Sequence, residues 1–190
     1  MKISEGIFFQ IMYNKDKNLY TINDPGNGYG TFIQLQREYY IKESSLINIG
    51  DSYLVFSYLP PKQSEFISDS KILKIGSDIN YHSILYVNVI CKDFQFDLVQ
   101  MFPSDDSIIK VGRDHECQLC LQDQMLSRVH CLIKYYSGKG WVIVDGGVRG
   151  NKSTNGTWMF TSEKTEIWDG MIFKSNSNLM SCHYKRNINF

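Results

Sequence analysis

The sequence predicts an all-β fold, and two observations support this. Short runs rich in Val, Ile, Phe, Tyr and Trp alternate with turn residues such as Gly, Pro, Asn and Asp, as in a series of strands. No stretch keeps the apolar spacing of an amphipathic helix. With 190 residues, of which 43% are hydrophobic, the chain is long enough for one large or two small domains with cores.

Residues 1–61 are expected to form a β segment of their own. Residues 62–81 follow Pro61 and mix Lys, Ser and Asp with the apolar run 71–75, which predicts a linker that contributes one strand. Residues 82–190 are expected to form a complete domain. The strands are expected at 6–13, 18–24, 30–35, 39–43, 52–59, 83–91 and 94–101, with a closing hairpin at 170–174 and 179–185.

Composition excludes several classes of protein. The formal net charge is +0, so no overall electrostatic field favours nucleic acid. Gln10 interrupts the apolar run 7–9, which is too short for a signal peptide or a membrane span. Five cysteines, an odd number, predict an intracellular protein of the cytoplasm, cytoskeleton or nucleus rather than a secreted disulfide scaffold.

Three expected loops between residues 109 and 158 carry chemistry suited to an anion. Gly112-Arg113 ends an apolar run, Ser127-Arg128 opens the next, and Thr154-Asn155-Gly156 is a turn signal. Together they supply a planar cation, hydroxyls and an amide. That mixture suits a phosphate monoester, which carries nearly two negative charges at neutral pH and three acceptor oxygens.

The order GR, then SRVH, then STNGT resembles the forkhead-associated (FHA) domain, a phosphothreonine-recognition module. The resemblance covers roughly residues 82–190 and implies an FHA-type β-sandwich of antiparallel strands. It also implies a protein-protein interaction module that recruits phosphorylated partners.

The resemblance assigns roles position by position. Arg113 matches the arginine that grips the phosphate, and its guanidinium can donate two parallel charge-assisted bonds. Ser127 matches the serine that donates its hydroxyl to phosphate, and Asn155 matches the asparagine that holds the peptide backbone. Thr154 and Arg128 are expected beside the phosphate. The positions that shape the loops without touching ligand are Gly112, His130, Gly156 and Thr157.

One stretch departs from the family pattern. Residues 146–152 intervene between Asp145 and the STNGT motif, where family members run on almost directly. Arg149 and Lys152 in this insertion could extend the basic rim. The preference for residues flanking the phosphothreonine is therefore not carried over from the family.

The N-terminal segment resembles the back half of a second, degenerate FHA-like domain. Asp24 is aligned with Asp145, and Gly30-Thr31 with Gly156-Thr157. Tyr29 stands in place of Asn155, and no upstream GR precedes Ser4, so no second phosphate site is expected. The remaining alignments pair Ser4 with Ser127, Ile7 with His130, and residues 46–51 with 167–171.

Such a half-domain leaves a strand edge open. The run 7–13 would carry unpaired backbone groups beside Phe8 and Phe9, an association hazard that proteins cover. The run 71–75 is too short to replace several strands. We therefore expect another chain to complete the segment; the alternative is that the missing strands lie upstream of Met1.

Two functions remain open. One is phosphothreonine reading; the other is a structural or scaffold subunit that uses the FHA fold for docking without phosphate recognition. The sequence shows no paired carboxylates, no phosphate-cradling loop and no activated nucleophile, so an enzyme is not predicted. His115, Cys117 and Cys120 form H-x-C-x-x-C, but Cys120 and Cys131 lie in apolar runs where free thiols are buried. No metal or other cofactor is therefore predicted.

Overall fold

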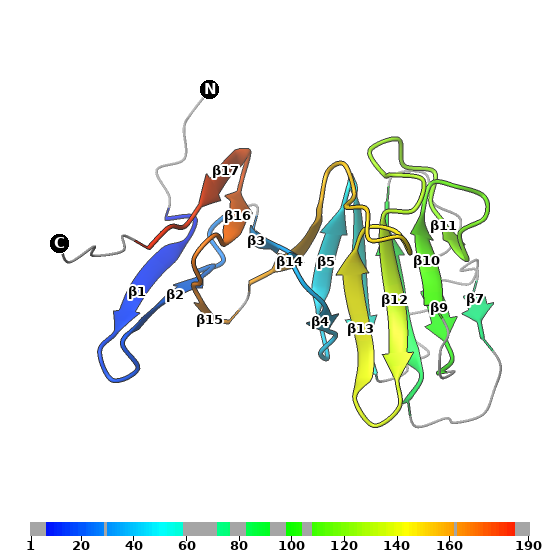
Figure 1. Ribbon diagram of the computed structural model, residues 1–190, viewed down its shortest axis with the longest axis horizontal. Coiled ribbons are helices and arrows are strands. Elements are labelled where there is room, and N and C mark those ends of the chain that lie inside the picture. Colours follow the sequence, from blue (N-terminus) through cyan, green and yellow to red (C-terminus); the bar gives the residue numbers. More distant parts are fainter. Residues whose placement is uncertain are drawn as a thin grey trace. The chain divides into compact units, whose positions relative to one another are not determined.

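The computed structural model describes residues 7–28, 30–58, 72–76, 83–91, 98–103, 108–161 and 163–184 (Figure 1). Strands are the regular elements throughout this part of the chain, which contains no α-helix. The expected all-β fold is confirmed.

The strands fall in two compact units. One unit is assembled from two separate stretches of the sequence, and the other from a single continuous stretch. Unit 1 comprises residues 1–34 and 159–190, and unit 2 comprises residues 35–158. The predicted boundaries at 61 and 82 do not coincide with these units. The boundaries at 61 and 82 remain a prediction of where the two sequence repeats begin and end.

Unit 2 contains two sheets. One has the order β11 (Leu119–Cys120), β10 (Ile108–Gly112), β12 (Cys131–Tyr136), β13 (Gly140–Asp145) and β4 (Tyr39–Tyr40). The other runs from β14 (Thr157–Phe160), which begins in this unit, through β5 (Leu46–Ile49), β6 (Ser52–Ser57), β8 (Leu85–Ile90) and β9 (Leu98–Met101) to β7 (Ile72–Ile75). The predicted linker strand at 71–75 is thus confirmed over residues 72–75, where β7 pairs with β9 in parallel.

The two sheets of unit 2 enclose one core. Alternate residues of β6 and β8 are buried, as expected of strands with one face inward. Trp141 of β13 donates its indole N–H to the carbonyl oxygen of Ser83, 2.7 Å away and just before β8, and so joins the sheets. The fully buried side chains include Ile47, Leu54, Phe56, Leu85, Val87, Ile133 and Ile143.

Unit 1 is smaller. One sheet has the order β1 (Gln10–Asn14), β2 (Leu19–Asn23) and β15 (Thr165–Glu166). The other has the order β17 (Asn178–Ser181), β16 (Ile172–Ser175) and β3 (Thr31–Gln34). The core between them consists of Ile22, Ile33, Ile167, Met171 and Phe173, with Phe9 packed edge-on against Phe173.

Hydrogen bonds identify the internal repeat residue by residue. Residues 30–58 correspond to residues 156–184, each 126 positions later (30 to 156). In β5–β6 Leu46 pairs with Val55, and in β16–β17 their counterparts Ile172 and Ser181 pair likewise. The Tyr58 hydroxyl donates to the Ile41 carbonyl oxygen, just as the Tyr184 hydroxyl donates to that of Ile167.

Two of the predicted alignments are wrong. Residues 46–49 form β5, whose counterpart is β16 (172–175) and not the stretch 167–171. The β1–β2 and β12–β13 registers place Phe8, not Ile7, at the position of His130. Both errors have the same cause: apolar strands separated by glycine turns align almost equally well when shifted by a few residues. Ser4 and Tyr29, the other residues of this comparison, lie outside the described residues.

The repeats exchange their last strands. In unit 2 the strands β8–β13 close with β4, β5 and β6 of the first repeat. In unit 1 the strands β1–β3 of the first repeat close with β15 and β16. The crossing segments make matching bonds in their own units: Leu35 N–H donates to the Thr157 carbonyl oxygen (2.8 Å) in unit 2, and Thr161 N–H to that of Thr31 (2.9 Å) in unit 1.

Candidate functional site

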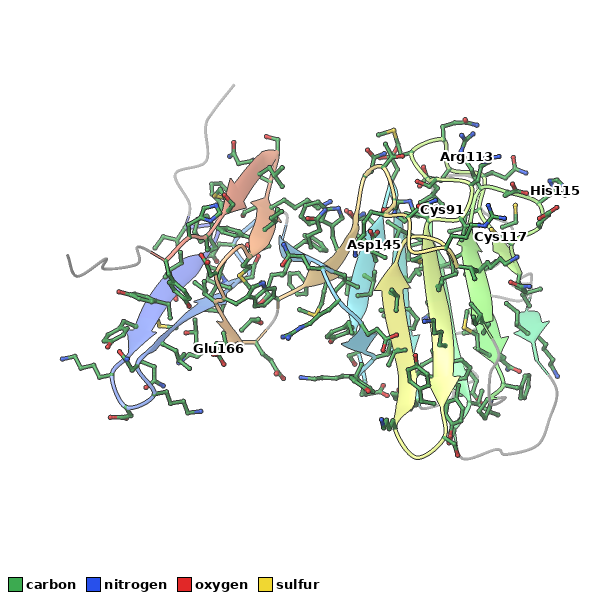
Figure 2. The ribbon with its side chains drawn as sticks, viewed as in Figure 1. Cys91, Arg113, His115, Cys117, Asp145 and Glu166 are labelled. Carbon is green, nitrogen blue, oxygen red and sulfur yellow. The ribbon has the colours of Figure 1, made fainter. Side chains whose placement is uncertain are left out.

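Arg113 lies at the loop end of unit 2, where β10 ends (Figure 2). Its side chain is exposed, and within the described residues its guanidinium makes no hydrogen bond or ion pair. Its backbone is fixed, because its N–H donates to the Ser127 carbonyl oxygen at 3.2 Å. The backbone therefore places the start of this side chain beside the Ser127 loop, and its exposed guanidinium is available to an anion.

Gly112 explains how the first two loops come together. A Cβ atom at Gly112 would lie 2.2 Å from the Arg128 carbonyl oxygen and 2.9 Å from that of Ser127. Only a residue without a side chain permits this approach. Arg128 itself is exposed, and its carbonyl oxygen accepts the N–H of Asp114 at 3.1 Å.

Ser127 and Thr154 join the second and third loops. The Ser127 hydroxyl accepts the Thr154 backbone N–H at 3.0 Å and donates to the Thr154 hydroxyl at 3.3 Å. Both hydroxyls thus lie side by side at the surface. A phosphate oxygen placed there could accept from either, because each hydroxyl can rotate its proton.

Asn155 is exposed, and part of its amide is already engaged. Its Nδ2 donates to the Met125 carbonyl oxygen at 2.7 Å, while its backbone carbonyl oxygen accepts the Trp158 indole N–H at 2.7 Å. The second amide proton and the side-chain oxygen have no hydrogen-bond partner within the described residues. These groups could pair with a peptide backbone.

Asp123 is a supporting residue that the sequence analysis missed. Its buried carboxylate accepts the Ser52 hydroxyl at 2.7 Å, the Asp51 N–H at 2.9 Å and the Met125 N–H at 2.8 Å. It therefore ties the β5–β6 turn of the first repeat to the loop that receives the Asn155 amide. The carboxylate sits four residues before Ser127, but nothing in the sequence indicates its distant partner.

His130 connects all three loops. It is fully buried, its Nδ1 accepts the Ser127 N–H at 3.2 Å, and its Nε2 lies 3.0 Å from the Gly156 carbonyl oxygen. The first bond makes Nδ1 the acceptor, so the ring is neutral with its proton on Nε2. Gly156 has a φ of +76°, a conformation that favours glycine.

Burial lowers the pKa of His130, against smaller raising effects of the Gly156 hydrogen bond and of Asp145 and Asp123. The folded state therefore resists protonation. Above the ordinary pKa of about 6.5 both states are neutral and the full stability is present. As pH falls below about 6.5, the unfolded state binds the proton first, and stability is lost until the lower folded pKa is reached.

We accordingly expect the free energy of unfolding of the peptide-free protein to decrease on acidification below about pH 6.5. Urea unfolding at a series of pH values, followed by Trp fluorescence, measures the slope. His130→Gln should flatten that slope, whereas exposed His183→Gln should leave it unchanged. An unaltered slope in His130→Gln would contradict the assignment.

Asp145 anchors the insertion. Its buried carboxylate accepts the Ser153 hydroxyl at 2.5 Å and the Thr157 hydroxyl at 2.8 Å. Residues 146–152 close on themselves, since the Gly147 N–H donates to the Asn151 carbonyl oxygen at 2.9 Å. Arg149 and Lys152 in this loop are exposed, and the loop leads directly to Thr154.

The structure thus joins Ser127 to Thr154, His130 to Gly156, and Thr157 to Asp145, with Gly112 packed against the Ser127–Arg128 backbone. It does not join the side chains of Arg113 or Arg128 to the others. The roles predicted for these residues toward ligand remain predictions.

The H-x-C-x-x-C motif, residues 115–120, lies shortly after Arg113. Figure 2 shows His115 and Cys117 in the loop that follows Arg113. Burial raises the pKa of the Cys117 thiol and of the Cys131 thiol. In the described part of the chain, no three His, Cys, Asp or Glu side chains are grouped so that they could hold a metal ion.

Comparison with known families identifies the loops. A model of the FHA domain family matches residues 109–174. The chain contains an FHA domain. FHA domains are phosphopeptide-binding protein-interaction modules and not enzymes. No curated protein and no solved structure matches the chain.

The FHA match spans both units: residues 109–158 belong to unit 2 and residues 159–174 to unit 1. The three loops that carry Arg113, Ser127 and Asn155 all belong to unit 2. No helix in the described ranges is long and apolar enough to cross a membrane.

Proposed function

We propose that the FHA domain reads phosphothreonine through Arg113, Ser127, Arg128, Thr154 and Asn155 and so recruits phosphorylated proteins. The observation that carries the proposal is that the Arg113 backbone is bonded to Ser127, whose hydroxyl is bonded to that of Thr154, while the exposed Arg113 guanidinium has no partner within the described residues. A dianionic phosphate placed there would meet a charge-assisted donor and two hydroxyls.

Phosphothreonine rather than phosphoserine is the proposed ligand because the family resemblance implies a small pocket for the threonine methyl group. The exposed Arg149 and Lys152 are proposed to favour acidic residues in the same peptide. The partner is therefore a protein carrying phosphothreonine in an acidic context, and not a nucleic acid.

The proposal is tested by titrating the protein with a library of phosphothreonine peptides and with their phosphoserine and unphosphorylated forms. Affinity is expected to fall with added salt, and to fall as pH drops through the second phosphate pKa of about 6. Equal binding of phosphorylated and plain peptides would refute phosphate reading. Equal binding of the two phosphorylated forms would refute only the threonine preference.

We expect one phosphopeptide to bind each chain, since the sequence has Tyr29 in place of Asn155 and no GR before Ser4. The structural register places Phe8, whose side chain has no hydrogen-bonding group, where unit 2 has His130. Isothermal titration calorimetry gives the stoichiometry. Two peptides per chain, of which one survives Arg113→Ala, would contradict this expectation.

A structural role is the second candidate, favoured by the exposed apolar residues of β1 and β2 in unit 1. In this role another chain completes unit 1, and the protein acts as a docking block in an assembly. Cys117, Cys120, Cys131 and Cys182 are free thiols, which supports the proposal that the protein works in a reducing, intracellular compartment.

A further inference from the structure

Within the described residues, unit 1 has fewer strands than unit 2. Within the described strands, β1 and β17 are the outer strands of their sheets in unit 1. Their counterparts in unit 2 have further neighbours: β12 pairs with β10, and β6 pairs with β8. Unit 2 therefore shows what a complete version of unit 1 contains at both edges.

Some residues of unit 1 are exposed although their counterparts in unit 2 are buried in the core. Ile11 is 49% exposed, whereas its counterpart Ile133 is 0% exposed. Tyr20 is 45% exposed, whereas its counterpart Trp141 is 1% exposed. The cross-strand ring pair is retained, with centroids 5.0 Å apart for Tyr13–Tyr20 and 5.3 Å for Tyr135–Trp141. In unit 1, therefore, side chains of the type that face the core of unit 2 are not covered by other described residues.

A pocket of about 390 Å³ opens at this face, wholly within unit 1. It is lined by Tyr20, Ile167, Cys182, His183 and Tyr184. Their counterparts in unit 2 are Trp141, Ile41, Phe56, Ser57 and Tyr58.

In unit 2 the corresponding place is filled by the beginning of β8. The Ser83 carbonyl oxygen accepts the Trp141 indole N–H at 2.7 Å. Tyr86 and Val87 pair with Ser57 and Phe56, and Leu85 is fully buried. The pocket of unit 1 therefore corresponds to the position that residues 83–87 occupy in unit 2.

We infer that unit 1 binds an extended strand of another protein, which pairs antiparallel with the free edge of β17 and places its first residues in this pocket. By analogy with β8, alternate residues of that strand are aliphatic, and one of its carbonyl oxygens accepts the Tyr20 hydroxyl. Strand addition of this kind satisfies exposed backbone groups and covers apolar side chains together.

The β8 strand of a second copy is not the occupant. That strand is already paired with β6 and β9, and Leu85 and Val87 are fully buried there. Releasing β8 would unfold unit 2 of the donor. The strand therefore comes from a different polypeptide, and the site is separate from the phosphate-binding loops.

The test uses the full chain and a synthetic peptide of residues 83–90 (SILYVNVI) flanked by lysines for solubility. Hydrogen exchange of β17 amides is expected to slow by about tenfold or more at saturating peptide. A peptide with Asp in place of Leu85 and Val87 should have no effect. Arg113→Ala should leave strand binding intact, which separates this site from the phosphopeptide site.

Tyr20→Ala is expected to weaken strand-peptide binding by about tenfold, because it removes an aromatic ring from the pocket. Tyr40→Ala, an equally exposed tyrosine of unit 2, is the matched control and should bind normally. The inference is overturned if peptide leaves β17 exchange unchanged or protects only unit 2. It is also overturned if the chain alone dimerises with β17 already protected.

Discussion

A fragment of residues 82–190 is expected not to bind phosphothreonine peptide, although it contains every residue of the proposed site. Unit 2 is closed by β4, β5 and β6, which belong to residues 39–57. Without them β8 loses its β6 partner, and Asp123 loses Ser52 and the Asp51 N–H. A buried carboxylate left without these donors costs about 1–3 kcal/mol or more, in addition to the lost core.

Two point variants of the full chain test the same exchange more sharply. Leu54 on β6 is fully buried in unit 2, and its counterpart Met180, 126 positions later (54 to 180), lies on β17 in unit 1. Leu54→Ala should destabilise unit 2 by about 2–5 kcal/mol, whereas Met180→Ala should leave unit 2 unaffected. Hydrogen exchange of β12 amides and phosphopeptide affinity near the unfolding temperature are the measurements.

The opposite pattern would show that the C-terminal repeat closes on itself. In that case Met180→Ala would destabilise unit 2, Leu54→Ala would not, and the 82–190 fragment would bind peptide. This outcome is physically possible, because β15–β17 match β4–β6 in register and could replace them. The two variants therefore distinguish the two ways of assembling the same strands.

The sequence predicts many of the strands and turns because each depends on local chemistry. The runs that became β12 and β13 are rich in branched and aromatic residues, and the turn at Asn155-Gly156 follows from the backbone freedom of glycine. Gly112 was expected to shape its loop, and the 2.2 Å approach of the Arg128 carbonyl oxygen gives the reason.

The exchange of strands could not be predicted from the sequence. β5 (LINI) and β16 (IFKS) are both short strands with an apolar inward face, so either can complete either sandwich. Which sandwich each strand completes depends on the paths of residues 34–36 and 158–161. The order of apolar and polar residues in these two segments does not indicate either path. Asp123 was missed for a related reason, since its main partners, Asp51 and Ser52, come from the other repeat.

Arg113→Ala is expected to weaken phosphothreonine-peptide binding by more than tenfold. A charge-assisted hydrogen bond contributes about 1.5–3 kcal/mol, and about 1.4 kcal/mol corresponds to a factor of ten in affinity. Because the Arg113 side chain has no partner within the described residues, its removal should not alter stability. Calorimetric titration at fixed salt, with thermal unfolding in parallel, measures both quantities.

Three matched variants separate charge, geometry and position. Arg113→Lys keeps the charge but loses the planar fork, so its affinity should lie between those of wild type and Arg113→Ala. Arg128→Ala and Arg149→Ala remove exposed charges next to the proposed phosphate position and should each cost less than Arg113→Ala. Equal losses in all three arginine-to-alanine variants would indicate a diffuse basic surface and not a phosphate site centred on Arg113. Unchanged affinity in Arg113→Ala would leave the structural role of the FHA domain as the better proposal.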